Sequence, residues 1–319
     1  RQGKSSMVTE RKTAVVTGGA GFIGSHLCEM LLGKGGKVIC VDNFITGNKR
    51  NIQHLLTNKN FEYVEHDITA PLKLSDFDVL YNLASPASPV DYYKKPIETL
   101  FAGSFGVKNM LDLCRETDAT FLQASTSEVY GDPKEHPQKE SYFGNVNPVG
   151  PRACYDESKR FAEALIVNYA QIYKQETRIA RIFNTYGPRM RKDDGRVIPN
   201  FITQALKNKP LTIYGKGQQT RSFCYVDDMV DGLMLLMDSD YPMPVNLGNQ
   251  QEFTMLALAD KIIQMAGSKS KKEFMPLPQD DPLQRNPDIS LAKKLLKWQP
   301  KTKFDDGLKK TVEWFGKNQ

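Results

Sequence analysis

Tyr155 and Lys159 form the clearest catalytic pattern in the sequence, because they lie four residues apart in a stretch with helical periodicity. At that spacing two side chains share one face of a helix. A free tyrosine has a pKa of about 10, and lowering it by about three units requires about 4 kcal/mol. One cation about 4 Å away supplies about that free energy at an effective dielectric of about 20. The pair predicts a tyrosine that acts as a general base beside a lysine ammonium.

A glycine-rich loop, GGAGFIG, lies between a predicted buried strand and a predicted helix. Gly18 suits a tight turn, Gly21 lets the backbone approach a pyrophosphate, and Gly24 lets the helix pack closely on the strand. Asp42 ends the next predicted strand, where its carboxylate can accept hydrogen bonds from a ribose hydroxyl and repel a 2′-phosphate. These features predict NAD rather than NADP, and the positive nicotinamide ring would also favour the tyrosine base.

Other residues at strand ends extend this predicted cofactor site. Asp67 and Ile68 follow the third predicted strand, at the position where such folds meet the adenine ring. The residues predicted to contact NAD are Gly18, Gly21, Phe22, Ile23, Gly24, Asp42, Asn43, Asp67, Ile68, Leu83, Ala84, Ser85, Tyr155 and Lys159.

Short apolar runs alternate with amphipathic helical patterns in the first half of the chain. The predicted strands are 13–17, 38–41, 61–64, 79–83, 120–124 and 178–183, and the predicted helices are 21–32, 96–116 and 155–173. Continuous apolar strands separated by helices are typical of a parallel sheet covered on both faces. The predicted fold class is α/β, with a doubly wound parallel sheet of the Rossmann type.

The alternation ends after Phe183. Shorter strands (211–214 and 223–226) and helices (198–207, 229–237 and 255–265) follow, and they predict a smaller C-terminal region over the carboxyl edge of the sheet, where such folds bind ligands. We expect an NAD-binding Rossmann domain over residues 8–183, rejoined by about 222–248, and a mainly substrate-binding domain over 184–319.

The glycine spacing GxxGxxG, together with YDESK at 155–159, resembles the extended short-chain dehydrogenases/reductases, over essentially the whole chain from Lys12. In that family the segment matching STSEVYG at 125–131 separates the chemistries. Sugar 4,6-dehydratases carry an Asp-Glu pair there, and 4-epimerases lack the Glu. This chain has Glu128 but Ser127 in place of the Asp. This segment therefore has one carboxylate and no second acid that could protonate a departing hydroxyl. In this respect the chain resembles the UDP-glucuronate decarboxylases.

Longer segments resemble the same decarboxylases: ASPASP at 84–89, GPRACYDE at 150–157, RIFNTYGPR at 181–189, and Asp280-Asp281-Pro282 with RNPDI at 285–289. The resemblance implies that Arg285 reaches the substrate carboxylate or guides protonation at C5. Asn184, Tyr214 and Arg221 match positions that hold the UDP moiety, and the planar fork of Arg221 suits a diphosphate. The implied catalytic set is Thr126, Glu128, Tyr155, Lys159 and Arg285, and the implied substrate-binding set is Glu128, Asn184, Tyr214, Arg221 and Arg285.

The activity implied by the resemblance is decarboxylation of UDP-glucuronate to UDP-xylose and CO₂ through a 4-keto intermediate, with tightly bound NAD oxidised and re-reduced in each turnover. Tyr155 would be the base, and Thr126 would hydrogen-bond the C4 oxygen. The alternatives are a UDP-sugar 4-epimerase or 4,6-dehydratase-like enzyme, and a non-catalytic NAD(H)-binding regulator. The intact Thr126, Tyr155 and Lys159 set favours an enzyme, and Glu128 without a neighbouring Asp favours the decarboxylase.

Two positions depart from the family pattern. A T-x-K-T-N stretch is usual in the helix after the fourth strand, whereas this chain reads TLFAG at 99–103, so substrate affinity there could differ. Ser158 replaces the usual glycine before the lysine, and we expect it to be harmless on a helix. Apolar positions on more than one face of helices 96–116 and 155–173 predict a homodimer with a four-helix interface.

Composition excludes several other classes of protein. The net charge is +6 with the Lys and Arg scattered, which argues against a nucleic-acid partner. The sequence contains no apolar run long enough to cross a membrane. Five cysteines without CxxC spacing argue against a disulfide scaffold and a zinc site, so no metal is expected. We expect a cytoplasmic protein, or one in the Golgi lumen if an N-terminal membrane anchor precedes this sequence.

Overall fold

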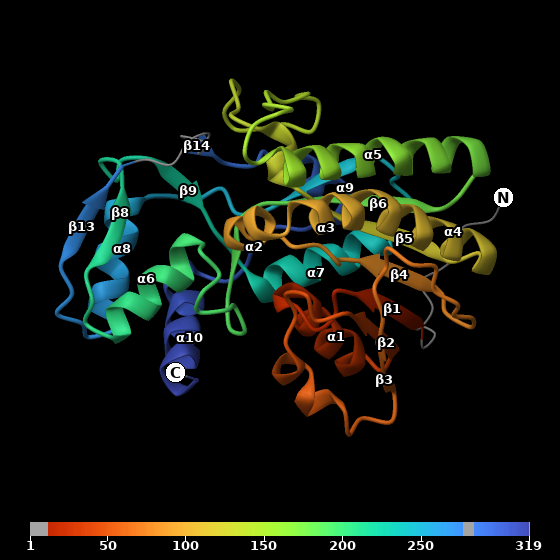
Figure 1. Ribbon diagram of the computed structural model, residues 1–319, viewed down its shortest axis with the longest axis horizontal. Helices are drawn as coiled ribbons and strands as arrows, with labels where there is room; N and C mark the ends of the chain where they lie inside the picture. The colour runs from red at the N-terminus through yellow and green to blue at the C-terminus, as the bar shows by residue number, and fades with distance from the viewer. Residues whose placement is uncertain (1–11, 277–283, 319) are drawn as a thin grey trace.

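The computed structural model describes residues 12–276 and 284–318, and a seven-stranded parallel sheet lies at its centre (Figure 1). Its strand order is β11-β6-β5-β4-β1-β2-β3. The strands are β1 (Thr13–Thr17), β2 (Lys37–Asp42), β3 (Phe61–Glu65), β4 (Val79–Asn82), β5 (Thr120–Thr126), β6 (Thr177–Ile182) and β11 (Pro244–Leu247). The strand order changes direction between β1 and β4, so the sheet is doubly wound. The predicted fold class is confirmed.

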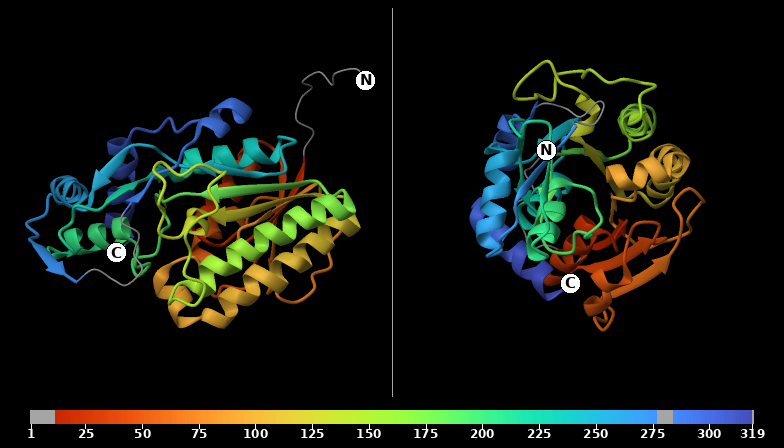
Figure 2. Two further views of the ribbon diagram at one scale, coloured as in Figure 1. Left: turned by 90° about the horizontal axis from the view of Figure 1, so that it is seen from above. Right: turned by 60° about the vertical axis from the view of Figure 1, so that its left-hand side comes forward.

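Helices cover both faces of this sheet, so that all of β4 and β1 from Ala14 onward are buried. One face is covered by α1 (Phe22–Gly33) and α7 (Val226–Met237), which also contact each other. The other face is covered by α4 (Val107–Thr117) and α5 (Ala153–Tyr173), which Figure 2 shows lying side by side. The carboxyl ends of the strands are left open at one edge, which is where a doubly wound sheet binds its ligands.

The helix predicted over residues 96–116 is interrupted. It consists of α3 (Pro96–Phe101), a π turn (Ala102–Gly106) and α4, and the short helix α2 (Pro89–Lys94) precedes it. Within the π turn the Ser104 hydroxyl donates to the Leu100 carbonyl oxygen (2.6 Å), so the wider turn has a side-chain bond of its own. A turn of this kind inside a helix often marks a functional position. Periodicity alone did not predict it, because a π turn adds one residue without ending the apolar stripe.

The C-terminal region lies beside the carboxyl edge of the sheet and is built from small sheets and short helices (Figure 1). Its helices are α6 (Val197–Leu206), α8 (Met255–Met265) and α10 (Phe304–Lys317), whereas α9 (Ser290–Leu296) packs against β11 of the large sheet and against α7. Its strands are β7 (Thr185–Tyr186), β8 (Leu211–Tyr214), β9 (Thr220–Ser222), β10 (Cys224–Tyr225), β12 (Glu252–Thr254), β13 (Lys272–Met275) and β14 (Gln284–Arg285). The smaller C-terminal region is therefore present as predicted.

The predicted strand 223–226 is shorter than expected, because α7 begins at Val226. Asp227 and Asp228 stand in the first turn of α7, where carboxylates interact favourably with the positive end of the helix dipole. After α7 the chain returns to the large sheet, and β11 pairs with β6. The domain limits at 183 and 184 stay a prediction, and residues 8–11 of the predicted first domain lie outside the described part of the chain.

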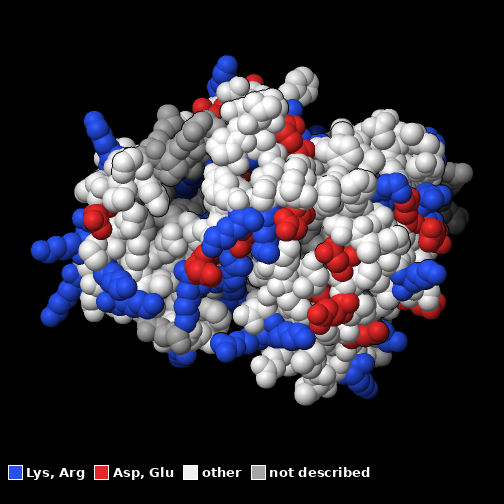
Figure 3. Space-filling model, viewed as in Figure 1, with Lys and Arg blue, Asp and Glu red and all other residues white. Residues whose placement is uncertain are grey.

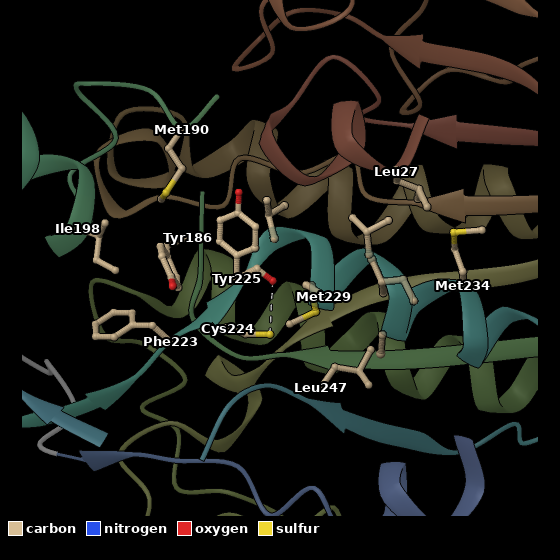
Figure 4. Close-up of a cluster of buried hydrophobic side chains, with 14 of the residues drawn as sticks. Leu27, Tyr186, Met190, Ile198, Phe223, Cys224, Tyr225, Met229, Met234 and Leu247 are labelled. Atoms are coloured by element: carbon tan, nitrogen blue, oxygen red, sulfur yellow. Dashed lines mark hydrogen bonds between the residues drawn. The ribbon is translucent and has the colours of Figure 1, made fainter. Parts of the chain in front are cut away.

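A continuous apolar core joins the sheet to the C-terminal region. Figure 4 shows part of it, with Tyr186, Phe223 and Tyr225 from the C-terminal side near Leu27 of α1 and Leu247 of β11. All of these side chains are buried. Because one apolar core spans both regions, it fixes the C-terminal region in position against the carboxyl edge of the sheet. Among the described residues, no helix has the length and apolar character needed to span a membrane.

Candidate active site

A cavity of about 770 Å³ lies at the carboxyl edge of the sheet and reaches into the C-terminal region. Every site residue named from the sequence lines it. They are Gly18, Gly21, Phe22, Ile23, Gly24, Asp42, Asn43, Asp67, Ile68, Leu83, Ala84, Ser85, Thr126, Glu128, Tyr155, Lys159, Asn184, Tyr214, Arg221 and Arg285. Residues predicted from separate segments are thus brought together in one place. Their roles stay predictions.

The glycine loop forms the end of the cavity between β1 and α1. Gly18 has a φ of +67°, and a Cβ there would lie 2.8 Å from the Ala84 backbone nitrogen. A Cβ on Gly24 would collide with the carbonyl oxygen of Gly18. A side chain at Gly18 would therefore push the loop away from the end of β4, and one at Gly24 would push α1 away from the loop. The glycines therefore let the N-terminal end of α1 lie against the cavity, where its N–H groups and dipole suit an anion.

Asp42 stands at the end of β2, with a 7% exposed side chain in the wall of the cavity. Its carboxylate accepts hydrogen bonds from the backbone N–H groups of Ala20 (2.9 Å) and Phe44 (2.8 Å). Burial raises its pKa, and these two hydrogen bonds oppose the shift. An ionised carboxylate has about four acceptor positions, so capacity remains for a ligand hydroxyl.

Asn43 and Asp67 lie beside it in the same wall. The Asn43 amide donates to an Asp67 carboxylate oxygen (2.9 Å), and the Thr69 backbone N–H donates to the other (2.9 Å). Burial alone would raise the pKa of Asp67, but these hydrogen bonds and that of the Thr69 hydroxyl lower it. The carboxylate is thus ionised and fixed in position.

Tyr155 and Lys159 lie on α5 and face the cavity, as their spacing predicts. The Tyr155 ring stacks on Tyr92 of α2, with 5.2 Å between ring centroids. Burial raises the pKa of Tyr155 to about 12, and a hydrogen bond with the Thr126 side chain opposes this shift. Burial thus works against the predicted base role, and positive charge near the phenol is needed to restore it.

Lys159 is 3% exposed, and its Nζ lies 5.7 Å from the centre of the Tyr155 ring. The ammonium donates to the Ala124 carbonyl oxygen (2.8 Å), which fixes it under the end of β5. Burial lowers the pKa of Lys159 to about 8, and the charge of Glu163 one turn further along α5 opposes the shift. Glu163 is itself held by Arg181 of β6 (2.7 Å) and by the Ser125 hydroxyl (2.6 Å).

Glu128 follows β5 directly, and two arginines bind it. Arg285 of β14 donates to Glu128 Oε2 (3.2 Å), and Arg152 at the N-terminal end of α5 contacts the same oxygen. Burial alone would raise the pKa of Glu128, but the charges of Arg285, Arg152 and Arg221 hold it below its ordinary value. The structure therefore joins the two residues that the resemblance connected to carboxylate chemistry.

Arg285 is 1% exposed and is fixed on three sides. Besides Glu128 it donates to the carbonyl oxygens of Ser127 and Gly131 (3.0 Å for the second). Its strand β14 pairs in parallel with β9, which places Arg285 opposite Arg221 in the register. Asp280, Asp281 and Pro282 of the same predicted motif lie outside the described residues.

The far end of the cavity contains the residues predicted to hold the nucleotide part of a substrate. Asn184 follows β6, Tyr214 ends β8, and Arg221 lies in the middle of β9. The Arg221 Nη1 donates to the Thr220 carbonyl oxygen (2.8 Å), which holds its guanidinium beside the strand. In Figure 3, Lys and Arg side chains gather near the middle of this face of the molecule.

Sequence reasoning missed several residues of the cavity. Arg152 binds Glu128, Tyr92 stacks on Tyr155, and Arg196 at the start of α6 acts electrostatically on Tyr155. Arg191, from the loop after β7, binds the Asp91 carboxylate of α2 through both oxygens (2.8 and 3.0 Å). Only Arg152 had a signal in the sequence, because it precedes Tyr155 by about one helical turn.

The family model that describes GDP-mannose 4,6 dehydratase matches residues 15–311. UDP-glucuronic acid decarboxylase 1 of Arabidopsis thaliana is 53% identical over 306 residues, which cover 96% of this chain and 70% of the plant protein. UDP-glucuronic acid decarboxylase 1 of Danio rerio is 51% identical over 308 residues, 97% of this chain and 73% of the fish protein.

Solved structures of nucleotide-sugar enzymes have the same fold as this chain. UDP-glucuronic acid 4-epimerase from Bacillus cereus, in complex with UDP-glucuronic acid and NAD, aligns with a TM-score of 0.87 and 31% identity over 96% of this chain and 100% of the other. The dTDP-glucose 4,6-dehydratase DesIV from Streptomyces venezuelae, with NAD bound, aligns with a TM-score of 0.88 and 26% identity, over 96% and 97% of the two chains. At about 50% identity over nearly its full length, and with the site residues in one cavity, the chain belongs to the family of the UDP-glucuronic acid decarboxylases.

Proposed function

We propose that this protein decarboxylates UDP-glucuronate to UDP-xylose and CO₂ through a 4-keto intermediate. The proposal rests on the 53% identical relative and on one observation in the cavity. A tyrosine–lysine pair and a carboxylate bound by two arginines line the same cavity. The tyrosine–lysine pair suits removal of a proton from a sugar hydroxyl. The carboxylate with its two arginines suits binding of the substrate carboxylate and protonation of C5.

We propose NAD as the cofactor, because the residues at the glycine-loop end of the cavity suit it. A Cβ at Gly18 would collide with the backbone of Ala84, and a Cβ at Gly24 with the Gly18 carbonyl oxygen, so only glycines allow this close turn before α1. The Asp42 carboxylate can bind a ribose hydroxyl and would repel a 2′-phosphate. When bound, NAD would accept a hydride from the C4 carbon of the sugar and later return it. Asn43, Asp67 and the backbone at Ala84 would hold the rest of the dinucleotide.

Tyr155 removes the proton of the C4 hydroxyl in this proposal. Its raised pKa means that the phenolate forms only where positive charge is close, and the Nζ of Lys159, one turn along the same helix, lies 5.7 Å from the centre of the Tyr155 ring. Thr126 holds the C4 oxygen beside the phenol. After CO₂ leaves, the same two groups stabilise the negative oxygen at C4 by preorganised hydrogen bonds.

Glu128 and Arg285 act at C5 and C6 in this proposal. Loss of CO₂ requires the C6 carboxylate to align with the C4 carbonyl, and an ion pair that is too strong would stabilise the ground state. Arg285 already bonds Glu128 and two carbonyl oxygens, so little of its charge is free to bind the substrate tightly. We therefore assign it mainly to the step after oxidation, in which it guides the proton to C5.

UDP-glucuronate labelled with ¹³C at C6 tests this function directly. NMR should show UDP-xylose and labelled CO₂ without added NADH, because the cofactor is regenerated in each turnover. Formation of UDP-galacturonate with retained label would instead identify a 4-epimerase. Binding of NAD without turnover of any UDP-sugar would support a regulator.

The remaining proposals concern assembly, domains and location. We propose a homodimer, because α3, the π turn and α5 expose large apolar side chains: Ile97 (56%), Phe101 (46%), Phe105 (54%) and Phe161 (51%). The division into an NAD-binding and a substrate-binding domain would be tested by limited proteolysis. The cytoplasmic location, with the Golgi lumen as alternative, would be tested by cell fractionation.

A further inference from the structure

Asp156 is a buried carboxylate that has no part in the function proposed above. It lies in the first turn of α5 and is 6% exposed. Its Oδ2 lies 3.9 Å from Arg152 Nε, which is longer than a hydrogen bond. Its Oδ1 has no hydrogen-bond partner within the part of the chain that the structure describes. An unmatched carboxylate oxygen in a buried position is costly in the charged form, so the position favours a proton.

Four charged side chains are linked across three separate segments. Arg285 of β14 binds Glu128, Glu128 also binds Arg152, and Arg152 lies next to Asp156. Arg285 is fixed by backbone carbonyl oxygens, whereas Arg152 lies between two carboxylates. With Asp156 protonated the four side chains carry one net positive charge, and with Asp156 ionised they carry none.

The titratable and charged groups that interact electrostatically with Asp156 come from three other elements and from α5 with its N-terminal end. Glu128 lies in the turn after β5, Arg285 in β14 and Tyr92 in α2, and the helix itself contributes Arg152, Cys154, Tyr155 and Glu157. Burial, and then the charge of Glu128, raise the pKa of Asp156 to about 7, while Arg152 and Arg285 oppose the shift. Glu128 has a lowered pKa, so Asp156 is the carboxylate of this cluster that changes charge near neutral pH.

We propose that Asp156 is a positioning residue whose protonation decides how Arg152 divides its contacts between Glu128 and Asp156. With the proton on Asp156, Arg152 stays on Glu128. Without it, the new negative charge competes for Arg152 and weakens its contact with Glu128, which Arg285 still binds. This inference rests on the proposed function, because Glu128 is the group through which Asp156 acts on the reaction.

Ionised Asp156 has two consequences that lower activity. The cluster loses its net positive charge, which weakens attraction of an anionic sugar acid. The charges of both Glu128 and Asp156 raise the pKa of Tyr155, so the base forms less readily. We therefore expect kcat/KM for UDP-glucuronate to fall as the pH rises through the pKa of Asp156. At pH 8 about one tenth of a group with a pKa of about 7 is protonated.

Asp156→Asn tests this, because asparagine has nearly the same shape and no charge at any pH. The kcat/KM of the wild type relative to that of D156N should fall about tenfold between pH 6.5 and pH 8, because Tyr155 and Lys159 titrate in both proteins and only the wild type has an ionisable group at position 156. Glu157→Gln is the matched control, because Glu157 is the next residue, 38% exposed and 3.7 Å from Arg160. E157Q should show the same fall relative to D156N, at a slightly lower pH, because the charge of Glu157 also raises the pKa of Asp156. A D156N profile that falls like the wild type would overturn the proposal.

Carboxyl ¹³C NMR of the wild type separates this inference from the proposed function. The Asp156 carboxyl resonance, assigned through its backbone, should titrate in the neutral range whether or not UDP-glucuronate is a substrate. If the wild type releases no CO₂, the proposed function is wrong, but the inference about Asp156 is not affected. If the titration midpoint of the Asp156 carboxyl resonance lies near pH 4, the inference about Asp156 is wrong. That outcome holds even if CO₂ is formed and even if D156N does not fold.

Discussion

Gly103 and Ser158 lie in contact where the π turn meets α5, and a Cβ on Gly103 would lie 2.6 Å from the Ser158 Cβ and 2.8 Å from its hydroxyl oxygen. These are two positions at which the sequence departs from the family pattern. Ser158 is 2% exposed, and its hydroxyl donates to the Tyr155 carbonyl oxygen (2.8 Å). The expectation that Ser158 is harmless on the helix stays a prediction, and the contact gives its condition, because Ser158 occupies the space into which a side chain at position 103 would extend.

The contact predicts that the two positions depend on each other. Gly103→Asn should lower the free energy of unfolding by about 1–3 kcal/mol, because overpacking a buried contact forces atoms apart. Adding Ser158→Gly should restore most of the loss, since it removes both crowded atoms. Urea unfolding of the two single variants and the double variant measures this. Equal stability of G103N and the parent would show that the helices move apart without cost.

Glu128→Gln should keep the fold and NAD binding but lose most turnover. A general acid–base group contributes typically 10²–10⁴-fold to the rate, and Glu128 is the carboxylate held between Arg285 and Arg152. Rates of UDP-xylose formation, with NAD affinity measured on the same samples, check the prediction. Retention of full activity in E128Q would mean that the carboxylate serves only to hold the two arginines.

Arg285→Ala should separate the oxidation step from the later steps. Bound NAD should still become partly reduced on addition of UDP-glucuronate, visible in the nicotinamide absorbance band, while UDP-xylose formation is largely lost. Arg285→Lys is the comparison, because it keeps the charge but not the three-way hydrogen bonding of the guanidinium. Unchanged UDP-xylose formation by R285A would remove Arg285 from the reaction.

Phe105→Glu together with Phe161→Glu should convert a dimer to a monomer, because charges would be buried in an apolar interface between helices. Sedimentation at micromolar concentration measures the change. Phe274→Glu is the control, since Phe274 is 55% exposed, about as much as Phe105 and Phe161, but lies in β13 of the C-terminal region. A wild type that sediments as a monomer at that concentration would contradict the four-helix interface.

The sequence determined the features that depend on neighbours in the chain. Apolar runs predict β1 to β6, because a strand buried on both faces needs no polar side chains. The four-residue spacing of Tyr155 and Lys159 places both on one face of α5, and the glycine loop needs only the strand before it and the helix after it. These are local geometric properties, and the structure shows them within a few residues of the predicted bounds.

Only the tertiary structure decided which distant side chains meet. Arg285, Glu128, Arg152 and Asp156 come from three segments, and nothing in their spacing indicates that two arginines share one carboxylate oxygen. Burial decides the pKa values too: it raises that of Tyr155 and lowers that of Lys159, against the direction that the pair alone predicts. The contact between Ser158 and Gly103 likewise exists only because α5 lies against the π turn. Desolvation and contact depend on the surroundings in three dimensions, and a sequence pattern contains only the order along the chain.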